Sequence, residues 1–221
     1  MDWDKAIKIN RKALTRIVAE IFALLGLVSG QTVERLPHAL YVAATRLLRP
    51  AESALRRLIV IAAHGLVVKP SSPRPMPKGQ TIVGAKSGRT SFQLFDTRKR
   101  FDFEKFENPF FITVKCYSRF PNPLFNPRFQ RRPEEPQGSM KAAQLCRRLA
   151  AVAHALETLP RQAQRLARWK ARREKMQNPK FTSPLRPGSP PGHSAKPKAE
   201  IDYILKECHA LAWDALRQDS S

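Results

Sequence analysis

The chain has 221 residues, with 40 Lys and Arg against 18 Asp and Glu, a formal net charge of +22 and a pI near 10.8. Hydrophobic residues make up 42% of the chain, which excludes wholesale disorder, and the pI exceeds the value of about 9 that is typical of nucleic-acid-binding domains. Residues 140–199 alone hold 14 basic and 2 acidic residues, so this stretch is expected to meet an anionic partner.

The N-terminal region, residues 1–67, contains three amphipathic segments. Apolar residues recur at three- and four-residue steps over 4–29, which predicts one helix whose apolar stripe is interrupted by Asn10. Proline suits the first turn of a helix, so two more helices are predicted over 37–48 and 50–64, with Arg56 and Arg57 on the solvent side of the latter. Three such helices predict a small helical bundle. The stripe of the first helix contains Ile7, Leu14, Ile17, Ile21, Leu24 and Val28.

The apolar run over 17–28 follows five basic residues, as the apolar region of a signal peptide does. However, Glu20 lies inside the run, Asp2 and Asp4 precede it, and the run is too short to span a bilayer. It is therefore expected to belong to a core or interfacial helix.

Residues 68–139 show no helical period and predict an extended arm rich in Pro and Phe. Ten of the twelve phenylalanines lie between Phe92 and Phe129, interleaved with Lys and Arg, and Asn-Pro pairs indicate turns. Residues 110–117 could form one short strand. The arm is expected to dock its aromatic side chains on a surface, either of the protein itself or of a partner; stacking on nucleic-acid bases is the alternative.

Residues 140–177 predict a basic amphipathic helix with a heptad seam, which Pro160 kinks or divides into two abutting helices. The seam consists of Leu145, Leu149, Val152, Leu156, Leu159, Ala163 and Leu166. A different face carries four arginines that also repeat at steps of four and three. This arginine ladder consists of Arg161, Arg165, Arg168 and Arg172.

The C-terminal part is divided into a flexible basic linker, residues 178–198, and an amphipathic helix within residues 199–221. The final region carries 2 basic and 5 acidic residues, a net charge of −3. The predicted fold is therefore mainly α. The stripes at 7–28 and 145–166 and the final helix are expected to share one discontinuous core, with the arm outside.

The arginine ladder is the candidate nucleic-acid-binding site, extended by Arg173 and Lys175. Guanidinium groups are planar, permanently charged and weakly hydrated, which suits bidentate contacts with phosphates. Several on one helix face can follow a nucleic-acid backbone. The alternatives are a solvated helix face, pairing with the acidic final helix, and binding to an acidic protein or lipid surface.

No catalytic, cofactor or metal site is predicted. Cys116, Cys146 and Cys208 are odd in number and widely spaced, which gives no disulfide framework or zinc spacing and favours a reducing, cytoplasmic compartment. The leading function is non-catalytic association with nucleic acid through phosphate contacts. The alternative is a protein-interaction scaffold that docks through residues 92–129 and the helical seams. Binding to a membrane surface through the first helix is not favoured.

Four short stretches carry a resemblance to other proteins. They are LRPAESALRRLIVIAA at 48–63, SFQLFDTRKRF at 91–101, LRPGSPPGH at 185–193 and IDYILKECHALA at 201–212. In these stretches the chain resembles a group of uncharacterised basic proteins of alphaproteobacteria. The resemblance implies a bacterial cytoplasmic protein and brings no activity, cofactor or catalytic residue, because no function is assigned to that group.

Overall fold

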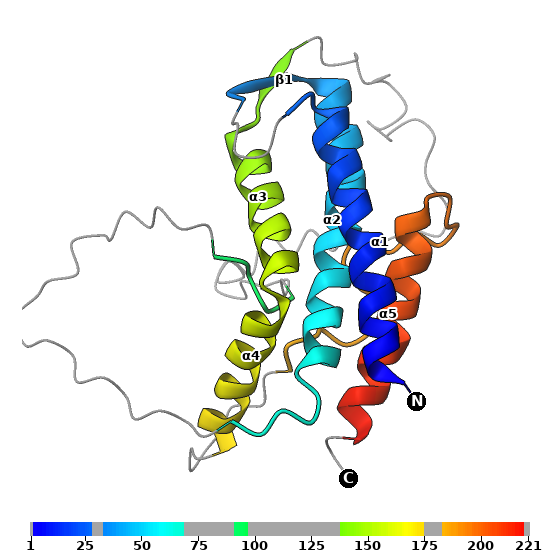
Figure 1. Cartoon of the computed structure of the whole chain (residues 1–221). Helices are drawn as coiled ribbons and strands as arrows, with labels where there is room; N and C mark the ends of the chain where they lie inside the picture. The colour runs from blue at the N-terminus through cyan, green and yellow to red at the C-terminus, as the bar shows by residue number, and fades with distance from the viewer. Residues whose placement is uncertain (1, 28–32, 69–90, 97–137, 175–182, 219–221) are drawn as a thin grey trace, which may run out of the picture. The chain divides into compact units, whose positions relative to one another are not determined.

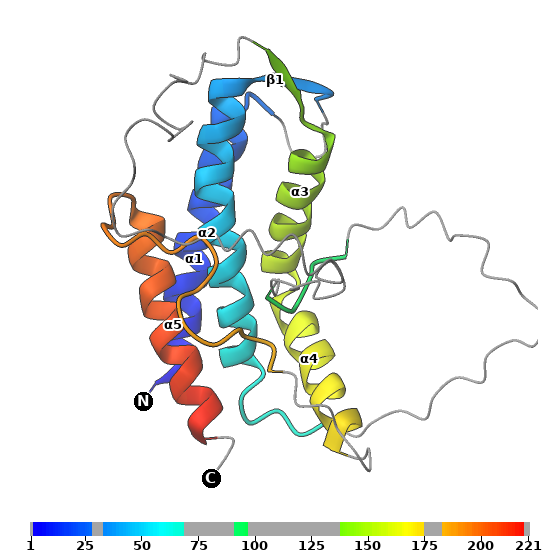
Figure 2. The same ribbon diagram turned by 180° about the vertical axis from the view of Figure 1, so that it is seen from behind.

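In the computed structural model, the helices are arranged around one long helix, α2 (His38–Ala62), as Figures 1 and 2 show. The structure describes residues 2–27, 33–68, 91–96, 138–174 and 183–218. The other helices are α1 (Trp3–Leu24), α3 (Ala143–Glu157), α4 (Leu159–Glu174) and α5 (Glu200–Gln218). These elements belong to one compact unit. The predicted mainly α fold is confirmed.

Helix α1 begins one residue before the predicted start, because Asp2 caps it by accepting a hydrogen bond from the backbone N–H of Lys5 at 3.0 Å. It ends at Leu24, earlier than predicted, and Gly26 follows with a φ of 63°, a left-handed conformation that suits glycine after a helix. Leu24 is consequently exposed, contrary to prediction. Asn10 is buried, and its side-chain amide donates to the backbone of Ala6 and to Glu207 of α5. The buried amide of Asn10 thus links α1 to α5 by a hydrogen bond.

Helix α2 runs through Pro50 without a break, so the prediction of two helices, over 37–48 and 50–64, is wrong. A proline inside a helix removes one backbone hydrogen bond and costs about 3 kcal/mol. The cost is offset here because the buried residues Ala44, Leu48, Ala51 and Leu55 continue one apolar stripe across the proline. Gly192, which is distant in sequence, approaches the backbone of the buried Pro50 closely. A Cβ on Gly192, where φ is 84°, would lie only 2.7 Å from the nitrogen of Pro50.

Two short strands that the sequence did not predict pair near the start of α2. They are β1 (Arg35–Pro37) and β2 (Ser139–Lys141), which are antiparallel with Leu36 opposite Met140. The backbone N–H of Ala142 continues the pairing by donating to the carbonyl of Glu34 at 2.8 Å. This pair brings the start of α3 beside the start of α2, although about a hundred residues separate them in sequence.

The predicted basic helix consists of two abutting helices, α3 and α4, which is the second of the two arrangements that Pro160 predicted. The break lies at Thr158, and Pro160 occupies the first turn of α4, where no backbone N–H is needed. The heptad seam continues across the break, because every one of its seven residues is at most 3% exposed. The predicted seam is confirmed.

Arg56 and Arg57 are buried, so their predicted place on the solvent side of the helix is wrong. The reason is that α2 is central: α1, α3, α4 and α5 pack around it, and the segment at 91–96 covers the two arginines. Arg57 is fully buried and donates to Asp96 at 3.1 Å and to the Nδ1 atom of His209 at 3.0 Å. Arg56 forms ion pairs with Asp96 at 3.7 Å and with Glu52 at 3.8 Å.

These buried charges form a cluster, here called the Asp96 cluster. It contains Glu52, Ser53, Arg56, Arg57, Asp96 and His209. Burial lowers the pKa of both arginines, and the nearby carboxylates oppose that shift. Glu52 also accepts two hydrogen bonds, at 2.8 and 3.0 Å, from Arg148 of α3, which raise the pKa of Arg148. The cluster therefore ties α2 to α3, α5 and the segment at 91–96.

The described parts of the arm and linker are packed on the helices. Phe92 and Leu94 are buried in the core, and the ring of Phe95 lies 4.8 Å from that of Trp169. Residues 97–137, including the predicted strand at 110–117, lie outside the described residues. Residues 183–198 of the expected linker form no helix or strand, yet Leu185 is fully buried. The backbone of Asp96 also donates to the carbonyl of Pro184, so these two irregular segments support each other.

Helix α5 presents the predicted apolar face to the core. Asp202 accepts hydrogen bonds from the backbone N–H groups of Lys198 and Ala199, which fixes the start of the helix. Cys208 lies on the buried face, and burial raises the pKa of its thiol to about 12. The buried residues of α5 are Ile201, Ile204, Leu205, Cys208, Leu211, Ala212 and Ala215.

Candidate nucleic-acid interface

The arginine ladder lies along the side of α4 that points away from the core. Helix α4 buries Leu159, Ala163, Leu166 and Ala167, and the opposite side of a helix must then face outward. All four ladder arginines are exposed. Since successive members are three or four residues apart, they form one row along the helix.

Two of the ladder arginines donate hydrogen bonds to neutral acceptors. Arg165 donates to the carbonyl of Phe92 at 3.0 Å and to the amide oxygen of Gln162 at 3.4 Å, and Arg172 donates to the carbonyl of Arg168 at 3.3 Å. Within the described ranges, no member of the ladder forms an ion pair with a carboxylate. These acceptors orient the guanidinium groups of Arg165 and Arg172 without cancelling their charge.

Arg173 does not continue the ladder outward. It is half-buried, and its guanidinium carbon lies 5.0 Å from the centre of the Trp169 ring, within the range of a cation–π contact. Lys175 lies outside the described residues. The part of the predicted site that forms one exposed row is therefore Arg161, Arg165, Arg168 and Arg172.

The acidic α5 does not neutralise the ladder, so that alternative is wrong for the described residues. Glu200 pairs with Arg16 of α1, and Asp214 pairs with Arg217 at 3.4 Å. The other two carboxylates of α5 accept hydrogen bonds: Glu207 from Asn10, and Asp202 from the backbone at the start of α5. Helix α5 packs mainly on α2 and also contacts α1.

The described part of the chain contains neither a metal-binding cluster nor a membrane-spanning helix. No group of three His, Cys, Asp or Glu side chains there could hold a metal ion. None of the described helices is both long enough and apolar enough to cross a membrane. The buried apolar stripe of α1, which includes Leu14, Ile17 and Ile21, faces the core, so inserting this stripe in a lipid surface would require the helices to separate.

No protein-family model matches the chain, and no curated protein or solved structure matches it.

Proposed function

We propose that this protein is a non-catalytic nucleic-acid-associated protein that binds phosphates through the arginine ladder, with little reading of base sequence. The observation that carries the proposal is a row of four exposed arginines on α4 with no carboxylate partner among the described residues. The net charge of +22 supports attraction to a polyanion over a longer range. A cytoplasmic location is part of the proposal.

The physical basis of binding is the release of counterions. Each phosphate that a cation neutralises frees condensed salt ions, so the affinity falls steeply as the salt concentration rises. For B-DNA the slope of log affinity against log salt is about −0.9 for each phosphate contact. Phosphate contacts fix a protein on the backbone but carry no sequence information, so binding is expected to differ little between sequences.

The test is binding of the full chain to DNA and RNA duplexes and to single strands across a salt series. Replacing all four ladder arginines with Gln should weaken binding to every sequence and flatten the salt slope by up to about 3.6 on B-DNA. Replacing them with Lys should largely restore the slope, because the charges remain. A triple variant that keeps Arg165, and with it the bond to Phe92, separates loss of charge from loss of that structural contact.

The matched control removes the same number of charges from exposed positions outside α4. It carries Gln at Arg46, Arg147, Lys196 and Lys206. A ladder variant that keeps the wild-type slope, or that changes no more than this control, would overturn the proposal. So would a wild-type protein that shows no salt-dependent binding to any of the nucleic acids.

The alternative of a protein-interaction scaffold predicts that the phenylalanine segment at 92–129 captures a partner. Phe92 and Leu94 are buried within the protein itself, which leaves them unavailable to a partner. Residues 97–129 lie outside the described residues. The structure thus supplies no observation that favours this function over the first.

A further inference from the structure

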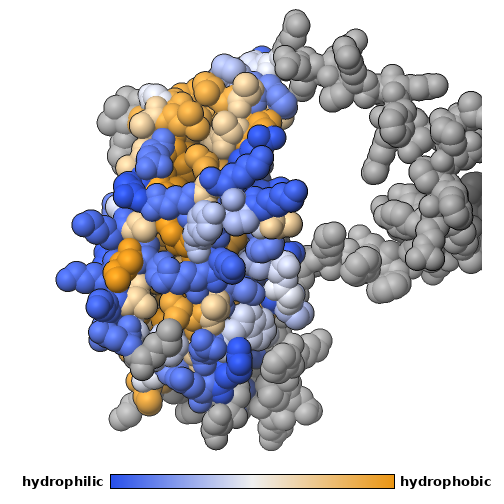
Figure 3. All heavy atoms as spheres, turned by 90° about the vertical axis from the view of Figure 1, so that its right-hand side faces the viewer, coloured by the Kyte–Doolittle hydropathy of each residue, from blue (hydrophilic) through white to orange (hydrophobic). Residues whose placement is uncertain are grey.

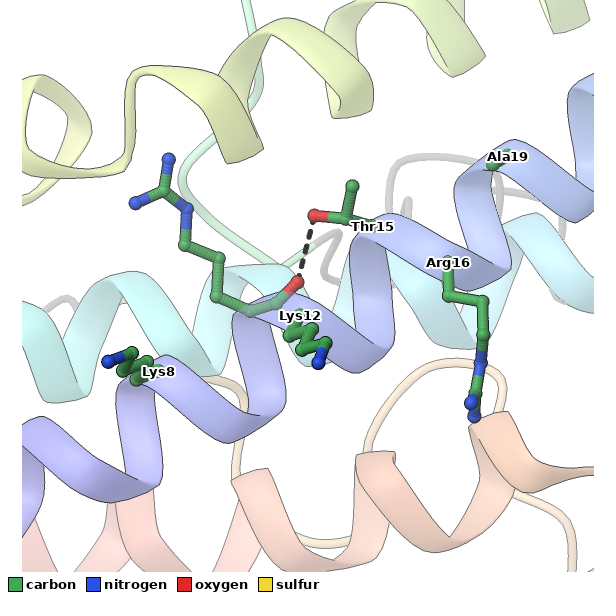
Figure 4. Close-up of a pocket in the computed structure, with 6 residues that line it drawn as sticks. Lys8, Lys12, Thr15, Arg16 and Ala19 are labelled. Carbon is green, nitrogen blue, oxygen red and sulfur yellow. Dashed lines mark hydrogen bonds between the residues drawn. The ribbon is translucent and has the colours of Figure 1, made fainter.

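Helix α1 carries a second basic surface, which the sequence did not predict as a site. Its outer side forms an open hollow of about 470 Å³, drawn in Figure 4. We call this surface the α1 basic face. It is lined by Lys8, Arg11, Lys12, Thr15, Arg16 and Ala19.

The α1 basic face follows from the helical repeat. Lys8, Lys12 and Arg16 are four residues apart and stack along one row, with a rise of about 6 Å for each step. Thr15 and Ala19 lie beside them and are small, and the hydroxyl of Thr15 is turned back to donate to the carbonyl of Arg11 at 2.9 Å (Figure 4). Short side chains between long cationic ones produce the hollow.

Most of the positive charge of the α1 basic face has no carboxylate partner. Arg16 pairs with Glu200 of α5, whereas Arg11 donates to the neutral carbonyl of Glu157 at the end of α3. These two arginines anchor the sides of the face to neighbouring helices. Lys8 and Lys12 are exposed, and neither forms an ion pair with any carboxylate in the described part of the chain.

The α1 basic face and the arginine ladder point in different directions. Each lies opposite the buried stripe of its own helix, and α1 and α4 each pack against α2. In Figure 1, α1 lies in front of α2, and in Figure 2 it lies behind α2, whereas α4 stays to one side in both views. Figure 3, which views the side where α5 lies beside α1, shows mainly hydrophilic residues with hydrophobic ones between them. Two basic surfaces are thus held on one set of packed helices.

From this arrangement, we infer that the protein has two phosphate-binding faces and holds two separate stretches of nucleic acid at once. The inference rests on the proposed function, because it takes the ladder as the first face. A single chain that binds through both faces would bridge two duplexes without forming a dimer. The α1 basic face would bind the phosphate backbone, because its cations attract phosphate charge and do not read base sequence.

The experiment is a capture assay with two duplexes of unrelated sequence, one fixed to beads and one fluorescent in solution. The full-length protein should bring the second duplex to the beads. Replacing Lys8 and Lys12 with Gln should reduce capture to the level seen without protein, while binding of one duplex through the ladder persists with its salt slope unchanged, because the two lysines contact the other duplex. Replacing the same two residues with Arg should preserve capture.

A matched control with Gln at Arg46 and Lys206 should capture the second duplex as the wild type does, because these exposed residues lie on α2 and α5. The inference is overturned if the Lys8 and Lys12 variant captures as well as the wild type; bridging would then come from self-association of a protein with one binding face. It is also overturned if the wild type binds one duplex through the ladder and captures no second one. The proposed function itself would fail only if binding of the wild type to a single duplex did not depend on the ladder.

Discussion

Removing the negative charge of Asp96 should destabilise the protein strongly. The carboxylate is almost fully buried, with Arg57 at 3.1 Å and Arg56 at 3.7 Å, and it accepts a hydrogen bond from the backbone of Arg186 at 3.3 Å. An Asp96→Asn substitution keeps the size and much of the hydrogen bonding but leaves two buried guanidinium groups facing a neutral side chain. Breaking a buried ion pair by removing one partner costs about 3–5 kcal/mol.

We expect the lower end of that range, about 3 kcal/mol, because Arg56 keeps its second partner Glu52. For a chain of this size the melting temperature should fall by about 6–12 °C. The measurement is urea unfolding followed by far-ultraviolet circular dichroism. The control is Asp214→Asn, because Asp214 pairs with Arg217 at 3.4 Å on the exposed surface of α5 and should contribute less than about 1 kcal/mol. If the two substitutions cost the same, the Asp96 cluster does not hold the segment at 91–96 in place.

Two further predictions concern His209 and Gly192. Burial and the adjacent Arg57 lower the pKa of His209 below its ordinary value, so the unfolded chain binds the proton more tightly and stability should fall as the pH drops below about 6.5. His209→Asn, which can still accept from Arg57, should show a smaller loss between about pH 7.5 and about pH 5.5 in urea unfolding. Gly192→Ala should lower stability more than Gly188→Ala, measured by thermal unfolding: both have positive φ, but only a Cβ at Gly192 would meet the backbone of Pro50. Equal losses would show that the close approach to Pro50 has no energetic consequence.

The parts of the fold that could be predicted are those in which local pattern and tertiary packing agree. The heptad spacing from Leu145 to Leu166 identified a stripe that is buried along its whole length, and the exposure of the ladder follows because it lies opposite that stripe. The last helix was predictable for the same reason. Proline prefers the first turn of a helix, so Pro50 by itself predicts the start of a new helix. However, the apolar residues on both sides of Pro50 bury one continuous stripe and hold a single helix together.

The parts that could not be predicted depend on segments that are distant in sequence. Arg56 and Arg57 look like solvent-facing residues of an amphipathic helix, because nothing near them indicates that Asp96 covers them. The pairing of β1 with β2 involves three residues on each side, too few for an alternating pattern to be visible. The α1 basic face does not stand out in the sequence, because its significance depends on which carboxylates the fold brings to it.

The distribution of acidic side chains is the strongest argument that the two basic faces are a feature of the fold and not merely of the composition. Glu52 and Asp96 form ion pairs with buried arginines, and Glu207 accepts a hydrogen bond that links α5 to α1. The ladder, Lys8 and Lys12 receive no carboxylate from the described residues. Under the proposed function, folding and binding depend on different charges, and the two can be separated. Asp96→Asn should lower stability without changing the salt slope of nucleic-acid binding, whereas the triple ladder variant that keeps Arg165 should flatten that slope with little effect on the unfolding free energy. If one substitution changed both quantities, the charges that hold the helices together would also be those that bind the phosphate backbone, and the assignment of separate roles would fail.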